Sequence, residues 1–189
     1  MDPFAGSGAV SRLGRFLGYK TASNDIESYA ALIAKSRITL SPVMMEAAFY
    51  GEGGSRAVFA ALNSFASGAK ASEAAAFLSS GKERETWLQA FYAAEKTAPY
   101  MGLHYAPSCT AEADWRSERL FYTAENAAFL DRARDAIEYR YPGDVLDASC
   151  SNPDAKAVLL DALLYQAATH TNTSGVFKAC HRGFGGHGR

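Results

Sequence analysis

The sequence predicts an α/β protein, with a partial Rossmann-like region over residues 1–41 and a large, mainly helical insertion over residues 42–189. Two observations carry this prediction. A glycine-rich turn at Gly6 and Gly8 is followed by a helical pattern, a short strand, an acidic residue and a second helix, which is the order of half a Rossmann-like fold. After Pro42 the chain becomes alanine-rich and helical in pattern, without the alternation typical of strands.

The first region contains a turn, two helices and one strand. Residues 8–17 carry apolar side chains three and four positions apart, which predicts a helix, and Gly18 suits the cap after its last turn. Residues 19–23 are predicted as a short strand that ends at an Asn-Asp pair. The apolar spacing over residues 26–36 then predicts the next helix.

The second region is predicted to be mainly helical. Thr123 suits the N-cap of a helix that runs to about residue 139. Asn152 before Pro153 predicts a helix that runs to about residue 168, because proline is tolerated in a first helical turn. Before these two helices, residues 98–118 are predicted as a long loop. The remaining helical patterns cover residues 42–50, 55–66, 71–80 and 83–97.

Composition and charge place the chain among ordinary globular proteins. Hydrophobic residues make up 48% and charged residues 21% of the 189 residues, so burial should outweigh chain entropy without covalent staples. The formal net charge is −1, so the chain as a whole does not attract nucleic acid. Any affinity for nucleic acid must therefore come from a local patch.

The cysteines and the apolar runs predict a cytoplasmic protein with no membrane segment. The three cysteines, Cys109, Cys150 and Cys180, are widely spaced and include no CxxC pair, which argues against a disulfide framework and a zinc knuckle. No apolar stretch approaches the roughly 20 residues that span a bilayer. Both ends have loop compositions, and we expect the chain to be a piece of a longer ancestral protein.

The glycine turn and the acidic residue after the strand form a candidate nucleoside site. Gly6 and Gly8 allow a tight turn that a ligand can approach closely, and the amides of the following helix suit a carboxylate or phosphate. Asp25 can accept hydrogen bonds from ribose hydroxyls. Phosphate-binding motifs fit less well, since GxxxxGK[ST] is absent and Ser11 stands at the third glycine of GxGxxG. A purely structural strand-to-helix turn is the alternative.

These residues also carry a resemblance to a known family. The run 2–8 resembles the cofactor motif of amino-methyltransferases that act on nucleic acid bases. The run 23–25 resembles the ribose-binding element of the Dam-like DNA adenine methyltransferases. Looser similarity extends over residues 121–127 with the helix after them, and over residues 159–163 leading into residues 171–177. The resemblance implies S-adenosylmethionine as cofactor, with the turn at its methionine end, Asp25 at its ribose and Phe4 beside the pocket. The implied cofactor-binding residues are Asp2, Pro3, Phe4, Ala5, Gly6, Ser7, Gly8, Asn24 and Asp25.

The resemblance implies transfer of a methyl group to adenine N6 in DNA, but one element of the family is missing. Its Asp/Asn-Pro-Pro-Tyr motif holds the amine of the flipped adenine in line with the methyl group. No such tetrapeptide occurs here, so no catalytic residue can be named. We expect weak or absent cofactor binding and no methyl transfer by this chain alone. The alternatives are a non-catalytic fragment or subunit that needs a second chain bearing the motif, and an RNA base methyltransferase.

A basic segment closes the chain. No acidic residue occurs from residue 162 to residue 189, and lysine and arginine supply most non-specific affinity for DNA phosphates. A solvated terminal loop is the alternative. A metal site is not predicted, since Cys180, His181 and His187 have no fourth ligand nearby. The residues predicted to bind DNA are Asn172, Lys178, His181 and Arg182.

Overall fold

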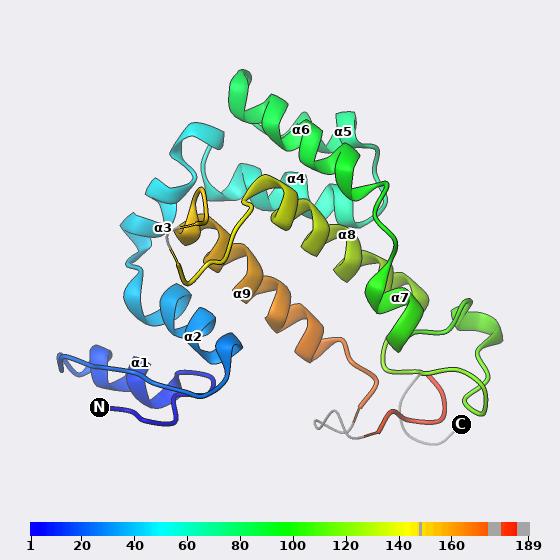
Figure 1. The fold of residues 1–189 in the computed structure, drawn as a ribbon, viewed down its shortest axis with the longest axis horizontal. Coiled ribbons are helices and arrows are strands. Elements are labelled where there is room, and N and C mark those ends of the chain that lie inside the picture. Colours follow the sequence, from blue (N-terminus) through cyan, green and yellow to red (C-terminus); the bar gives the residue numbers. More distant parts are fainter. Residues whose placement is uncertain (148, 174–178, 185–189) are drawn as a thin grey trace.

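A computed structural model describes residues 1–147, 149–173 and 179–184, and most of its regular structure is helical (Figure 1). A π-helix, Lys35–Thr39, continues directly from α2, and short 3-10 turns span Tyr50–Glu52 and Thr110–Glu112. The α-helices are α1 Ala9–Phe16, α2 Ser28–Ala34, α3 Pro42–Ala48, α4 Ser55–Ala66, α5 Ala71–Ala75, α6 Lys82–Ala94, α7 Tyr100–Tyr105, α8 Ala124–Arg140 and α9 Pro153–Thr169.

The predicted α/β, partial Rossmann-like fold is wrong for the described residues, which form no β-strand and no sheet. Strand-like pairing is reduced to two isolated bridges, a parallel one between Asp2 and Ser23 and an antiparallel one between Thr173 and Cys180. The predicted strand over residues 19–23 therefore pairs at a single position. Two parallel β-strands are stable only inside a larger sheet that is covered on both faces. The rest of the described chain supplies helices instead of further strands.

The helices with local start signals lie where the sequence predicts them. Thr123 caps α8 by accepting a hydrogen bond from the Asn126 amide at 3.1 Å. Asn152 caps α9 in the same way from the Ala155 amide at 3.1 Å, with proline in the first turn. Gly18 follows α1 with a φ of 84°, in the left-handed region that glycine adopts freely.

The predicted long loop over residues 98–118 is partly wrong, because it contains α7. The Asp131 carboxylate on α8 is buried and accepts hydrogen bonds from the first amides of α7, at 3.0 Å from Tyr100, 2.7 Å from Met101 and 2.9 Å from Gly102. A carboxylate at a helix N-terminus satisfies amides that have no partner within the helix. The cap comes from a later helix, so the local sequence of α7 carries no sign of it.

The core lies between α4, α5, α6, α8 and α9. Helix α8 runs through its centre and contacts α4, α6, α7 and α9 (Figure 1). Phe65 of α4 stacks on Phe91 of α6 with ring centroids 4.4 Å apart, and Trp87 lies 5.3 Å from Phe91. Alanines at the helix contacts, such as Ala133 and Ala136, are fully buried and let the helices approach closely.

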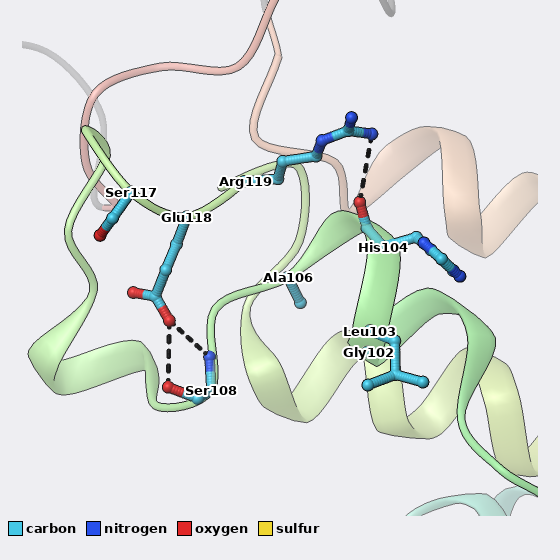
Figure 2. Close-up of a pocket in the computed structure, with 8 residues that line it drawn as sticks. All are labelled: Gly102, Leu103, His104, Ala106, Ser108, Ser117, Glu118 and Arg119. Atoms are coloured by element: carbon cyan, nitrogen blue, oxygen red, sulfur yellow. Dashed lines mark hydrogen bonds between the residues drawn. The ribbon is translucent and has the colours of Figure 1, made fainter.

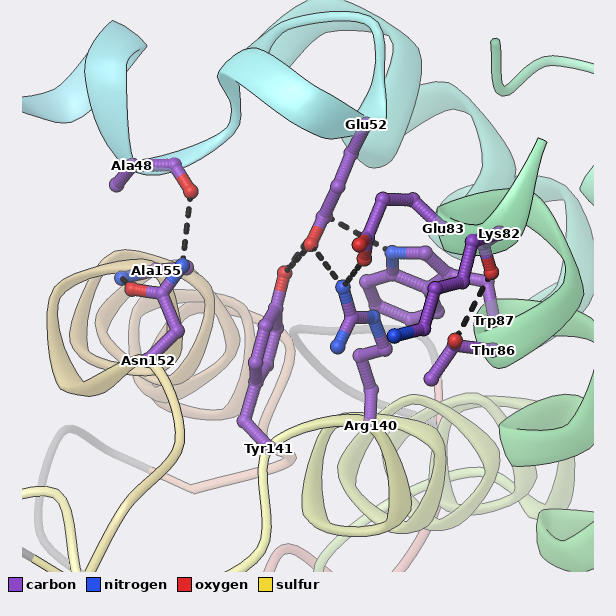
Figure 3. Close-up of polar contacts among 10 residues, drawn as sticks. All are labelled: Ala48, Glu52, Lys82, Glu83, Thr86, Trp87, Arg140, Tyr141, Asn152 and Ala155. Atoms are coloured by element: carbon purple, nitrogen blue, oxygen red, sulfur yellow. Dashed lines mark hydrogen bonds and ion pairs between the residues drawn. The ribbon is translucent and has the colours of Figure 1, made fainter. Parts of the chain in front are cut away.

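A buried polar cluster around Glu52 fixes one end of this core (Figure 3). Glu52 is only 4% exposed, and its carboxylate accepts hydrogen bonds from Trp87 Nε1 at 2.9 Å and from the Tyr141 hydroxyl at 2.7 Å. Arg140 pairs with Glu52 and with the more exposed Glu83. Burial, reinforced by the neighbouring Glu52 carboxylate, raises the pKa of Tyr141 far above its ordinary value, so the phenol stays protonated and donates.

Residues 1–27, which include α1, lie beside α2 at the edge of the molecule (Figure 1).

Two ion pairs join the π-helix after α2 to α9. Arg37 Nε lies 2.7 Å from Asp161 Oδ2, and Lys35 Nζ lies 3.3 Å from Asp154 Oδ1. The hydrogen bond to Asp161 raises the pKa of the Arg37 guanidinium.

Helix α1 turns its apolar side outward. An apolar stripe on a helix normally faces a core, yet Val10, Leu13, Phe16 and Leu17 are all exposed, while Ser11 on the other side is 1% exposed. Within the described part of the chain no helix, α1 included, is long and apolar enough to cross a membrane.

Candidate functional site

The glycine turn forms as the sequence predicts and opens directly into α1. Gly6 and Gly8 have φ values of 47° and 74°, and the Gly8 amide donates to the Ala5 carbonyl at 2.6 Å. Gly8 occupies the N-cap position and brings no side-chain cap to the helix. A Cβ at Gly8 would lie 3.1 Å from Ile38 Cδ1, so both its φ and its surroundings favour glycine.

Asp25 lies against this turn. Its Oδ2 accepts a hydrogen bond from the Gly6 amide at 2.8 Å, and its Oδ1 accepts one from the Glu27 amide at 3.1 Å. The Gly6 amide first, and then the Glu27 amide, hold the pKa of Asp25 below its ordinary value. The side chain is therefore ionised at neutral pH, and each oxygen keeps a lone pair that can accept a further hydrogen bond.

Backbone hydrogen bonds join the start of the chain to the segment before Asp25. The Asp2 amide donates to the Ala22 carbonyl at 2.8 Å, and the Asn24 amide donates to the Asp2 carbonyl at 2.9 Å. The Ala5 amide donates to the Asn24 carbonyl at 3.0 Å. These bonds place Asp25 beside the turn, and Asn24 contributes through its backbone.

Ser11 supplies a polar connection that the sequence analysis missed. Its hydroxyl donates to Asp2 Oδ2 at 2.8 Å and accepts from the Ser23 hydroxyl at 2.7 Å. This chain links α1, the first residues and the segment before Asp25. The available signal was the serine itself, which stands where the dinucleotide motif has a third glycine.

The other predicted residues of the turn divide by exposure. Ala5 is buried under the turn, whereas Pro3, Phe4 and Ser7 are exposed. The Phe4 ring is 87% exposed, so it is free to cover a ligand at the turn.

Of the residues predicted to bind DNA, Asn172, His181 and Arg182 belong to the C-terminal segment, which lies beside the loop after α7 at the other end of the molecule from α1 (Figure 1). The Asn172 side chain is occupied internally, since its Nδ2 donates to the Leu120 carbonyl at 2.9 Å and to the His181 carbonyl at 3.3 Å. His181 and Arg182 are exposed. Lys178 lies outside the described residues.

An open hollow of about 510 Å³ lies beside α7 rather than at the glycine turn (Figure 2). Its lining includes Gly102 and His104 of α7 and Ser108, Glu118 and Arg119 of the loop that leads to α8. Glu118 holds the loop by accepting from the Ser108 amide at 2.9 Å and the Ser108 hydroxyl at 3.0 Å. The glycine turn is instead a surface site on which a ligand would be held by backbone amides and one carboxylate.

Comparison of the chain with protein-family models, with curated proteins and with solved structures gives no match. The interpretation of the turn therefore rests on its geometry and its sequence motif. Among the described residues, no three His, Cys, Asp or Glu side chains gather where they could hold a metal ion.

The hydrogen bond from Gly6 to Asp25 predicts a shared titration. The pKa of Asp25 is depressed in the folded chain, so its contribution to the turn is present above the unfolded pKa and is lost as the pH falls through the folded pKa. In an NMR titration, the Gly6 amide and the Asp25 carboxyl should shift with one midpoint, below the ordinary value for aspartate. Asp25→Asn should abolish the Gly6 titration. A Gly6 amide that ignores Asp25 would contradict the geometry.

Proposed function

We propose that this chain is the cofactor-binding part of an S-adenosylmethionine-dependent DNA adenine-N6 methyltransferase, with residues 2–25 as the site for the cofactor. The observation that carries the proposal is the Asp25 carboxylate, whose Oδ2 lies 2.8 Å from the Gly6 amide in a turn that opens a helix. The motif over residues 2–8 and the Asn-Asp pair support it, because both resemble elements of that family.

Two kinds of group at the turn suit the two polar ends of an adenosyl amino acid. The first amides of α1 have no partner within the helix and no side-chain cap, so they suit a carboxylate. The ionised Asp25 suits a pair of ribose hydroxyls, each of which donates a hydrogen bond. Bound S-adenosylmethionine would supply the methyl group on its sulfonium.

The proposed reaction needs a group that this sequence does not contain. Without Asp/Asn-Pro-Pro-Tyr, nothing holds the adenine amine in line with the methyl donor. We propose that a second chain or segment supplies it and that the present chain alone transfers no methyl group. Methyl incorporation into DNA from labelled cofactor by this chain, lost in Asp25→Ala, would overturn this part of the proposal.

Titration of the chain with S-adenosylmethionine, followed by the amide shifts of Gly6 and Gly8, tests the site. We expect weak, saturable binding with a dissociation constant well above the low-micromolar range, because the site is an open surface that offers only backbone amides and one carboxylate. Asp25→Asn should weaken binding by about tenfold or more, since a hydrogen bond to a charged group contributes about 1.5–3 kcal/mol. The matched control is Glu27→Gln, which removes an exposed carboxylate from the same loop and leaves its backbone bond to Asp25 in place.

Two results would contradict the proposed site. Equal affinity of the native and Asp25→Asn chains for S-adenosylmethionine would contradict the proposed contact between Asp25 and the ribose. Loss of binding in Glu27→Gln to the same degree would show that only the local negative charge matters.

A further inference from the structure

The loop between α7 and α8 meets the C-terminal segment at a second cluster of functional groups. The Asn172 amide donates to the Phe121 carbonyl at 2.7 Å, and the His181 amide donates to the Asn172 carbonyl at 3.0 Å. These bonds bring Arg182 to the loop that contains Trp115, although the two residues are far apart in the sequence.

The guanidinium groups of two arginines lie over the ring of Trp115. The guanidinium carbon of Arg182 lies 4.5 Å from the centroid of the Trp115 ring, and that of Arg116 lies 4.8 Å from it. The ring is 40% exposed, and both arginines are exposed. A guanidinium stacked on an aromatic ring keeps its N–H edges free, and these edges match the oxygens of a phosphate.

Two acidic side chains of this loop, Glu118 and Asp114, accept hydrogen bonds within it, and a third, Glu112, is exposed. Glu118 accepts from Ser108 and from the Asp114 amide at 3.1 Å. Asp114 accepts from the Arg116 amide at 3.0 Å and lies 3.9 Å from the Arg116 guanidinium, a long contact between exposed groups. Glu125, in the first turn of α8, accepts from the Thr110 hydroxyl of the loop. These three bonded carboxylates therefore shape the loop, while the guanidinium groups of Arg116 and Arg182 remain exposed and available to a ligand.

We propose that Trp115, Arg116, Arg119 and Arg182, the arginine–tryptophan surface, bind the phosphate backbone of DNA. Arg119 borders the hollow beside α7 and makes only a long contact, 3.5 Å, to the His104 carbonyl (Figure 2). The segment from residue 162 onward has no acidic residue to oppose a polyanion. The choice of DNA as the polyanion rests on the function proposed above.

Fluorescence anisotropy of a labelled DNA duplex, without cofactor, tests this surface. The double variant Arg116→Ala and Arg182→Ala should bind about 50-fold more weakly at 0.1 M salt, because each lost phosphate contact costs nearly tenfold there. The plot of log affinity against log salt should become shallower by about one unit for each arginine removed. Arg56→Ala at the start of α4, away from this loop, removes one exposed charge and should bind like the native chain (Figure 1).

Trp115→Ala separates positioning from charge. It should weaken binding several-fold while leaving the salt slope unchanged, since both arginines remain, and Trp115→Phe should restore most of the affinity. Unaltered affinity and slope in the double arginine variant would overturn the proposal, as would tighter binding of single-stranded RNA than of the duplex. A native chain that binds no duplex also overturns it and leaves the cofactor site untouched, because Asp25 is tested without DNA.

Discussion

Glu52→Ala should destabilise the chain by about 3–5 kcal/mol, the largest effect that we expect from a single substitution. The change leaves the largely buried Arg140 guanidinium without its buried partner and removes the acceptor for Trp87 Nε1 and the Tyr141 hydroxyl. Removing one member of a buried charged pair costs this much because the other charge stays desolvated. Urea unfolding followed by circular dichroism gives the free energy directly.

The matched control is Glu83→Ala, which removes the second carboxylate on Arg140. Glu83 is more exposed, and Arg140 keeps its pairing with Glu52, so the loss should be about 1 kcal/mol or less. If the two variants unfold at the same urea concentration, the Glu52 cluster does not hold the core as the structure indicates.

Asp131→Ala should free α7 from α8. Three amides, those of Tyr100, Met101 and Gly102, lose their acceptor together, and a lost cap of this kind costs about 2 kcal/mol. Hydrogen exchange of these amides should accelerate by up to about 30-fold, which corresponds to that free energy. The hollow beside α7 should lose its shape, because three of its lining residues belong to this helix.

Asp131→Asn provides the control for this cap. The asparagine oxygen can still accept from the Tyr100 and Met101 amides, so their protection should largely remain, while the Gly102 amide loses its acceptor and should exchange faster. Equal exchange rates in Asp131→Ala and the native chain would mean that α7 is held by its side-chain contacts alone.

The sequence predicts those parts of the fold whose signals are local. Thr123 and the Asn152-Pro153 pair mark helix starts by bonding to amides three residues away, and both predictions hold. Helix α7 escapes the same reasoning, because its cap, Asp131, lies on another helix. The strand over residues 19–23 was predicted from the order of elements, but a strand also needs neighbours, and the described chain provides a single bridge at Ser23.

The candidate sites show the same division. The sequence motif predicts that Asp25 lies beside the glycine turn, but not that its carboxylate accepts a hydrogen bond from the Gly6 amide. The stacking of Arg182 on Trp115 was not, because it depends on how the C-terminal segment returns to the loop before α8. The sequence predicts that Asn172 contacts DNA, and it gives no sign of the hydrogen bond that the Asn172 side chain donates to the Leu120 carbonyl.

The outward apolar side of α1 has a consequence for ligand affinity. Side chains such as Leu13 and Phe16 remain in water, so this helix gains little from the hydrophobic effect that stabilises α4 and α8. Its order depends on a few hydrogen bonds around Asp2 and Asp25. Part of the binding free energy of any molecule at the glycine turn must then go into ordering the segment, and the apparent dissociation constant rises in inverse proportion to the fraction of time the turn is formed.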